Sequence, residues 1–423
     1  MKIAIINQSA STGGWRYLYL LIKNMKEIKS DLDITIYVSF IKGVEEVEKL
    51  KEIDVKLKEI EYSVEVPKIF KEKNKFKAKI FNFIYNNIRK KIFNLKKIKT
   101  QIFKKNYWND LKSFDCIFYS WPYDIECPLG LNKPIFFIPH DFIFTHFFGM
   151  HSIHSYTREW YIKQKKLLNV FIKNGNAIVS SPYIARELDR TFPEYKNHYK
   201  KDVDIVFLSS FNEYEELKQN EINEVLKKYD IKDDYILYAN NWALHKNMQI
   251  VIGAYYLVKQ KYPNIKLIIT GYGTEGIYCQ CNTPYYLDHI DENEKYDVKS
   301  LGILSNKEFS AVLQGSKMVI NSSLCEAGSG NGVDAWNLGV PVVMSGIESF
   351  KEQIEFLGVK AELFDPRNST DVARAILEIL DNPEKAKKNA EISKEKIKEY
   401  SWEKIAKQYI NIFERGIKNE KND

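Results

Sequence analysis

Two carboxylates flank a glycine-rich stretch in the second half of the chain. Glu326 precedes the segment Gly328-Ser329-Gly330-Asn331-Gly332, and Asp334 follows it. The residues before this stretch are typical of a strand, and those after it are typical of a helix that ends at Gly339. A glycine-rich loop at a helix N-terminus offers backbone N–H groups to an anion such as a pyrophosphate. Carboxylates at its two ends can accept hydrogen bonds from sugar hydroxyls.

A glycine pair follows the first expected strand, Ile3–Ile6. Gly13 and Gly14 precede a helix that we expect to begin near Trp15. Glycines let the backbone approach a ligand closely, and the helix N-terminus can bind an anion. The segment is not G-x-G-x-x-G, and no Gly-Lys-Ser/Thr follows, so it predicts neither a dinucleotide fingerprint nor a P-loop. The alternative interpretation is a tight structural turn.

Beyond these two loops, the stretch from Asn321 to Val343 resembles the E-x7-E segment of family 4 glycosyltransferases, which have the GT-B fold. Glu326 matches the first acid, and Asp334 stands at the second. Three further segments match the family: Leu338-Gly339-Val340-Pro341-Val342-Val343, Phe364-Asp365-Pro366, and Tyr235–Ala239 followed by Lys246-Asn247. The N-terminal half resembles it more loosely, through Gly13-Gly14 and Pro139-His140-Asp141.

The resemblance implies a role for each matching residue. Lys246 is expected at the phosphates of a nucleotide-sugar donor, Asp334 at its ribose, and Glu326 and His140 at the transferred sugar. The amides of residues 328–332 are expected at the pyrophosphate or sugar. The sequence departs from the family's pattern at three positions: Asn241 replaces an arginine of the phosphate loop and carries no charge, Asp334 is one methylene shorter than Glu, and Gly328 stands where an aromatic residue is common.

The resemblance also implies the reaction. The chain would transfer a sugar, with retention of configuration, to a glycan or lipid-linked acceptor in cell-surface polysaccharide or glycoconjugate synthesis. No cofactor is expected, and the pattern requires no metal. Two alternatives remain open. One is a catalytically inactive GT-B-like binding partner in a glycan-assembly complex, and the other is a sugar epimerase or phosphorylase of the same fold.

The elements that position these residues alternate along the whole chain. Short apolar runs rich in β-branched and aromatic residues are separated by helical patterns, which predicts parallel sheets covered on both faces. A charged stretch at Ser209–Asp233 separates two such series. We therefore predict two Rossmann-like domains that face each other across a cleft, with boundaries at 1–210 and 211–400 and a C-terminal helix in 401–423 that packs back on the first domain. The expected strands are Ile3–Ile6, Ile34–Val38, Cys116–Tyr119, Ile135–Ile138, Ala177–Val179, Ile205–Leu208, Tyr235–Ala239, Lys266–Thr270, Met318–Asn321, Val340–Val343 and Ala361–Phe364.

The charge is concentrated in one segment. The 423 residues carry a net charge of +7, but residues 67–107 hold 14 Lys or Arg and one acid, Glu72, and so carry +13. Aromatic residues such as Phe70, Phe76 and Phe83 lie among these basic ones. An anionic membrane surface is a possible partner, and a solvated helix face with aromatics in the core is the alternative. No recognised nucleic-acid module is present. With five cysteines, no signal peptide and no apolar run of membrane-spanning length, we expect a cytoplasmic protein, peripheral on the inner face of the plasma membrane if the segment binds lipid.

Overall fold

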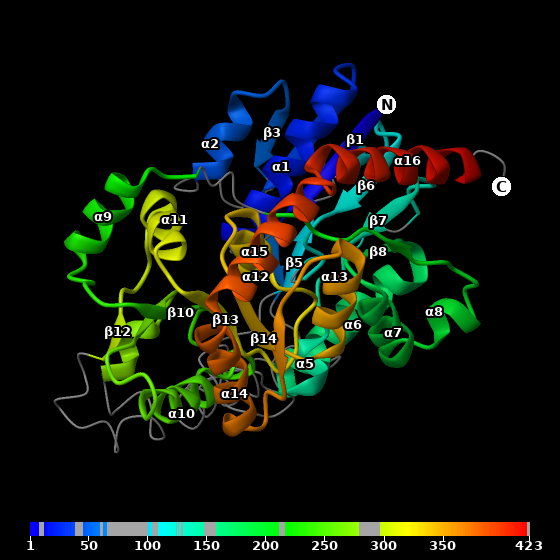
Figure 1. The fold of residues 1–423 in the computed structure, drawn as a ribbon. Helices are drawn as coiled ribbons and strands as arrows, with labels where there is room; N and C mark the ends of the chain where they lie inside the picture. Colours follow the sequence, from blue (N-terminus) through cyan, green and yellow to red (C-terminus); the bar gives the residue numbers. More distant parts are fainter. Residues whose placement is uncertain are drawn as a thin grey trace, which may run out of the picture.

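The structure is a computed structural model, and it describes residues 1–7, 12–38, 45–59, 62–65, 100–103, 109–123, 125, 127, 130–147, 158–210, 216–278 and 297–420. Two parallel sheets with helices on their faces make up most of this part of the chain (Figure 1). The prediction of two Rossmann-like domains is confirmed. The basic segment 67–107 lies outside the described residues except for one short strand, residues 100–103.

The N-terminal sheet has the order β3-β2-β1-β6-β7-β8-β9, and all of its pairs are parallel. Alternate residues of β1 enter different cores, because successive side chains of a strand point to opposite faces. Ile3 and Ile5 belong to one core and Ala4 and Ile6 to the other. The strands are β1 (Lys2–Asn7), β2 (Asp33–Val38), β3 (Lys56–Glu59), β6 (Cys116–Tyr119), β7 (Ile135–Phe137), β8 (Asn176–Val179) and β9 (Asp204–Ile205).

The C-terminal sheet has the order β12-β11-β10-β13-β14-β15 and is also parallel. β11 and β12 lie on one side of β10, and β13, β14 and β15 lie on its other side. The direction in which strands are added therefore reverses between β10 and β13. The strands are β10 (Tyr235–Ala239), β11 (Lys266–Thr270), β12 (Val298–Ser300), β13 (Met318–Asn321), β14 (Val342–Ser345) and β15 (Glu362–Phe364). A separate antiparallel pair joins β4 (Tyr62–Glu65) to β5 (Thr100–Phe103).

Helices cover both sheets. In the first half they are α1 (Thr12–Ile28), α2 (Glu45–Lys51), α5 (Ile143–His146), α6 (Arg158–Asn174), α7 (Pro182–Thr191) and α8 (Glu194–Asn197). In the second half they are α9 (Gln219–Lys228), η1 (Leu244–Lys246), α10 (Met248–Lys259), η2 (Thr274–Tyr278), α11 (Asn306–Gln314), α12 (Gly330–Asn337), α13 (Glu348–Leu357), α14 (Ser369–Asp381), α15 (Pro383–Lys398) and α16 (Trp402–Glu420).

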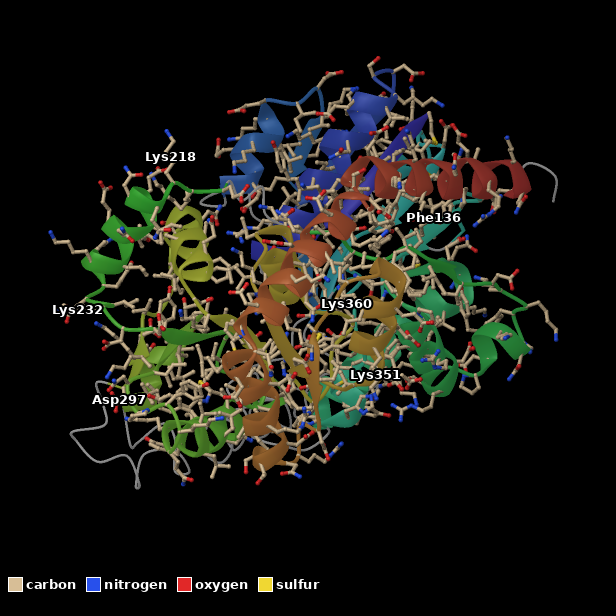
Figure 2. The ribbon with its side chains drawn as sticks, viewed as in Figure 1. Phe136, Lys218, Lys232, Asp297, Lys351 and Lys360 are labelled. Carbon is tan, nitrogen blue, oxygen red and sulfur yellow. The ribbon has the colours of Figure 1, made fainter. Side chains whose placement is uncertain are left out.

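The last helix crosses to the N-terminal half. α16 runs beside α1 over the N-terminal sheet (Figure 1). Its Phe413 ring packs against Phe118 and Phe136, with centroids 5.3 and 4.9 Å apart. Phe136 lies under this helix (Figure 2), and its ring packs so closely against Gly416 that a Cβ at position 416 would collide with it. No helix among the described residues is long and apolar enough to cross a membrane.

Three details differ from the sequence expectation. The first helix begins at Thr12, so Gly13 and Gly14 lie in its first turn rather than before it. The strand expected at Val340–Val343 begins at Val342, because the Val340 amide bonds back to Ala335 and Pro341 has no N–H to give a ladder. The strand expected at Ile205–Leu208 is only the two-residue β9.

Candidate active site between the two sheets

Lys246 and Glu326 form an ion pair at the carboxyl ends of two neighbouring strands. η1 brings Lys246 from β10, and the loop after β13 brings Glu326. Glu326 Oε1 also accepts a hydrogen bond of 3.1 Å from Ser323 Oγ, and His245 Nε2 lies 3.6 Å from it. Burial raises the pKa of Glu326. The charges of Lys246 and His245, together with the hydrogen bonds, lower it by more than burial raises it, so the pKa lies below its usual value. Glu326 is therefore an ionised carboxylate at neutral pH.

A cavity of about 500 Å³ opens beside Lys246. It lies where the strand order reverses at β10 and β13, which is where open α/β sheets bind their ligands. Residues from both halves of the chain line it: Gly13, Arg16, Ala239, Asn240, Asn241, Lys246, Thr270, Gly271, Tyr272, Ile303, Leu304, Asn306, Phe309, Asn331 and Asp334. The cavity thus brings together five residues singled out in the sequence, namely Gly13, Asn241, Lys246, Asn331 and Asp334.

The loop before α12 uses part of its hydrogen-bonding capacity internally. Ser329 caps the helix by accepting from the Gly332 amide at 2.9 Å, and its own amide donates to Gln353 Oε1 at 2.7 Å. The amides of Ser329 and Gly332 thus have partners within the protein, and the expected contact of residues 328–332 with a pyrophosphate or sugar stays a prediction. A Cβ on Gly332 would lie 2.8 Å from Met344 Cε and from Ser329 Oγ, so close packing accounts for this glycine.

The start of α12 carries two polar side chains of the cavity. Asn331 Nδ2 donates to the carbonyl of Ala239 and, at 3.0 Å, to Asn240 Oδ1. Asp334 is 4% exposed, and its Oδ1 accepts a 2.9 Å hydrogen bond from Ser210 Oγ, which belongs to the segment joining the two halves. Asp334 is thus tied to the interdomain connection, a contact that its sequence position does not reveal.

Two side-chain amide atoms of the cavity residues lack partners. Asn240 Nδ2 and Asn241 Oδ1 are buried atoms without a hydrogen bond to any described residue. A buried polar group without a partner costs about 1–3 kcal/mol. A polar ligand that offers an acceptor to Asn240 and a donor to Asn241 would recover that free energy.

His140 lies on the N-terminal side of the cleft, after β7. Its Nε2 is 2.6 Å from the carbonyl oxygen of Ser120, so this nitrogen carries a proton and donates it. Burial lowers the pKa of His140 to about 4, against the opposing hydrogen bond to Ser120. The ring is therefore neutral, with Nδ1 as an acceptor. It packs between Trp121 and Tyr17, with ring centroids 4.7 and 6.3 Å away.

Asp141 is a residue that the sequence interpretation did not assign to the site. Burial raises its pKa to about 6, although Oδ1 accepts from the Ile143 amide at 3.1 Å. The charges of Glu326 and Lys246 also act on its pKa, in opposite directions. Asp141 therefore lies close enough to the Lys246–Glu326 pair for both charges to act on it. The only sequence signal for this residue is its place directly after His140.

Arg16 was also missed. Its Nη2 donates to Asn306 Oδ1 at 2.7 Å, and its Nε lies 3.0 Å from Glu46 Oε1. The contact with Asn306 joins α1 to the start of α11 across the cleft. Because it links positions 290 residues apart, no local pattern signals it.

A second cavity of about 500 Å³ lies at the carboxyl ends of β14 and β15. The expected segment Phe364-Asp365-Pro366 lines it, together with His146 and Tyr183 from the N-terminal half. Leu324 and Cys325 also line it, and both contact the apolar cluster of Ile143 and Phe147. The other expected site residues line neither of these two cavities; they are Gly14, Gly328, Ser329, Gly330, Gly332, Glu326 and His140. Among the residues that the structure describes, no group of three or more His, Cys, Asp or Glu could hold a metal ion.

The second half of the chain matches a known protein family. The family model for "Glycosyl transferases group 1" matches residues 218–396, which include the second sheet, Lys246, Glu326 and Asp334. No curated protein matches the chain in sequence. The chain is similar in structure to a glycosyltransferase from Rickettsia africae, with a TM-score of 0.63 and 15% identity over 99% of both chains.

Two further solved structures share the architecture. Anabaena Alr3699/HepE, in complex with UDP and glucose, has a TM-score of 0.65 and 14% identity over 98% of this chain and 99% of its own. WaaG, a glycosyltransferase involved in lipopolysaccharide biosynthesis, has a TM-score of 0.61 and 9% identity over 98% of this chain and 99% of its own. The chain therefore has the GT-B fold of glycosyltransferases along nearly its whole length, and its C-terminal half matches the group 1 glycosyltransferases in sequence.

Proposed function

We propose that the protein transfers a sugar from a nucleotide-sugar donor to a glycan or lipid-linked acceptor, with retention of configuration at the anomeric carbon. The observation that carries the proposal is that Lys246, Asn331 and Asp334 line one cavity at the switch point of the C-terminal sheet. The solved complexes of Alr3699/HepE with UDP and with UDP-glucose support a nucleotide-sugar as the donor.

Each residue has a physical role in this proposal. The Lys246 ammonium stabilises the negative charge that develops on the leaving phosphate, because a fixed cation in a partly dry site needs no reorganisation. Asp334 accepts hydrogen bonds from the ribose hydroxyls. Glu326 accepts from the hydroxyls of the transferred sugar, and the neutral His140 bonds the same sugar from the other side of the cleft.

The leaving phosphate takes part in the chemistry. The bond between the anomeric carbon and the phosphate oxygen breaks, and the acceptor oxygen attacks the same face of the sugar. The acceptor's proton passes to the leaving phosphate oxygen, so that the nucleoside diphosphate leaves and the protein supplies positioning and electrostatic stabilisation. This step requires neither a protein nucleophile nor a metal.

The proposed acceptor class is supported by two of the similar solved structures. WaaG acts in lipopolysaccharide biosynthesis, and a TarM structure contains α-GlcNAc-glycerol and UDP. A surface or envelope glycan is therefore the acceptor class that we propose. A cytoplasmic location, with attachment to the inner membrane face through residues 67–107, would bring a lipid-linked acceptor to the cleft.

One experiment tests the donor assignment. Thermal unfolding is measured with UDP, GDP and ADP and with their sugar conjugates, and free nucleoside diphosphate is measured after incubation with each conjugate. We expect one base series to stabilise the protein, by about 2.7 kcal/mol at a ligand concentration of 100 Kd. We also expect slow release of that diphosphate and, with an added alcohol as acceptor, an NMR spectrum showing that the glycoside formed keeps the donor's anomeric configuration. Failure of every nucleotide to stabilise the protein would contradict the proposal.

The same experiment separates the second candidate, an inactive GT-B-like binding partner. Asn241 favours that candidate, because an uncharged amide stands where the family's phosphate loop usually has arginine. An inactive partner would bind the nucleotide and release nothing on prolonged incubation. An epimerase would return an altered nucleotide-sugar, and a phosphorylase would require inorganic phosphate for turnover.

A further inference from the structure

Arg16 and Lys246 are the two basic side chains among the described residues that line the donor cavity. They enter it from opposite sides, since α1 of the N-terminal half carries Arg16 and η1 of the C-terminal half carries Lys246. The lining set contains one carboxylate, Asp334, which is already bonded to Ser210. A diphosphate that enters this cavity therefore meets two cations, one from each half of the chain.

The charge of Lys246 is largely compensated before a donor arrives, because it forms an ion pair with Glu326. Asn241, at the position where the family has its second cation, is uncharged and has an unpartnered buried oxygen. An amide carries no net charge, so Asn241 contributes less to binding a phosphate than an arginine would. Among the described residues of the C-terminal half that line the cavity, Lys246 is therefore the one basic side chain, and Glu326 shares its charge.

The Arg16 guanidinium is held in a position from which it can supply a second positive charge to a diphosphate. Its Nε edge is held by Glu46, whose side chain is only 5% exposed, and its Nη2 points across the cleft to Asn306. A guanidinium presents donors on more than one edge, so it can keep one carboxylate and bind a second oxyanion at the same time. The neutral amide oxygen of Asn306 is a weaker acceptor than a phosphate oxygen, which forms a charge-assisted hydrogen bond.

We propose that Arg16 is the second cation of the diphosphate site and takes over the charge that Asn241 does not provide. The assignment rests on the proposed function. On donor binding, the Nη2 hydrogen bond moves from Asn306 Oδ1 to a phosphate oxygen, while Glu46 continues to hold Nε. The donor site is thus complete only when both halves of the chain contribute.

The test removes the positive charge at position 16 and introduces one at position 241. The variants are Arg16→Gln, Asn241→Arg, and the two combined. Because Arg16→Gln leaves the buried Glu46 without its partner, Arg16→Gln/Glu46→Gln serves as a second version with no unpaired carboxylate. Arg415→Gln is the matched control, since Arg415 is an exposed arginine on α16 whose partner is Asp204. Affinities are measured by calorimetry for the nucleoside, the monophosphate and the diphosphate of the base that stabilises the wild-type protein.

We expect both Arg16→Gln versions to weaken diphosphate binding at least about tenfold and to leave nucleoside binding unchanged. Asn241→Arg should restore the diphosphate affinity of Arg16→Gln to within about threefold of wild type, and Arg415→Gln should match wild type. If Arg16→Gln left diphosphate affinity unchanged, or weakened nucleoside binding equally, the role of Arg16 would be overturned and the proposed function would not. A wild-type protein that binds no nucleoside diphosphate would overturn the proposed function, and this assignment with it.

Discussion

Removing one partner of the Lys246–Glu326 pair should cost both stability and activity, whereas removing both should cost activity alone. Glu326→Gln leaves an ammonium facing a neutral amide. Lys246→Met leaves the Glu326 carboxylate without its cationic partner, with Ser323 and His245 beside it among the described residues. The double variant leaves no unpaired charge. The three variants together separate the structural part of the interaction from its catalytic part.

The size of the effect follows from burial. Breaking a buried ion pair by removing one partner costs about 3–5 kcal/mol. The Lys246 and Glu326 side chains keep 19% and 14% of their surface exposed, so the lower figure, about 3 kcal/mol, applies. For a domain of this size, that corresponds to a fall in Tm of roughly 6–12 °C. The double variant should lose less than about 1 kcal/mol, because the desolvation cost of both charges disappears together.

Thermal unfolding and turnover are then measured on the same preparations. Each single variant and the double variant should lose at least about tenfold in turnover, or about 1.4 kcal/mol of transition-state stabilisation. The informative protein is the double variant, which should be nearly as stable as wild type and yet slow. Single variants with wild-type Tm, or a double variant with wild-type turnover, would refute the reasoning.

The remaining predictions concern other parts of the chain. Burial raises the pKa of Asp141 to about 6, so the protonated carboxyl stabilises the folded state below pH 4 and this contribution is lost as pH rises through 6. Asp141→Asn should therefore raise the free energy of unfolding by up to about 3 kcal/mol at pH 8 and change it little at pH 4. Thermal unfolding at both pH values measures the difference. Gly332→Ala should destabilise by about 1–3 kcal/mol, because its methyl group would collide with the capping Ser329 as well as with the buried Met344. Gly13→Ala, with nothing within 4 Å, should not destabilise, and equal Tm changes would contradict this. A chelator should leave most turnover intact, and full loss that manganese or magnesium restores would show a metal requirement. The segment 67–107 should bind anionic but not neutral liposomes, and less at high salt, in co-sedimentation assays; equal binding to both would exclude an electrostatic anchor.

Buried strands were predictable because their sequence and their environment carry the same signal. The expected bounds of β6, β10, β11 and β13 agree with the structure residue for residue, and each of these strands is an apolar run covered on both faces. β3 was missed because it is a polar strand at the sheet edge, where Lys56 and Glu59 are exposed and no apolar run forms. β12 is another edge strand with only three residues, too short for a pattern.

The site was predictable to the extent that its residues follow strand ends of one sheet. Lys246 and Glu326 lie after β10 and β13, which are neighbours, so their contact follows from the order of the strands. Arg16 could not be found in this way, because its place in the cavity depends on how the two halves pack. The engagement of the Ser329 and Gly332 amides also needed coordinates, since a capping serine in sequence does not show which amides it satisfies.

The connection between the halves bears on both the shape of the cleft and the site. The chain passes between the sheets twice, near Ser210 and near Trp402, and the two passages are bonded together. Trp402 Nε1 donates to the Ser210 carbonyl at 2.5 Å, and Tyr400 Oη donates to the Phe207 carbonyl at 2.9 Å. Ser210 Oγ in turn donates to Asp334, the carboxylate expected at the ribose. Asp334 is thereby bonded to the segment that joins the two halves of the chain. A ribose bound at Asp334, as proposed, would therefore share this carboxylate with Ser210, a residue of the segment that joins the two halves.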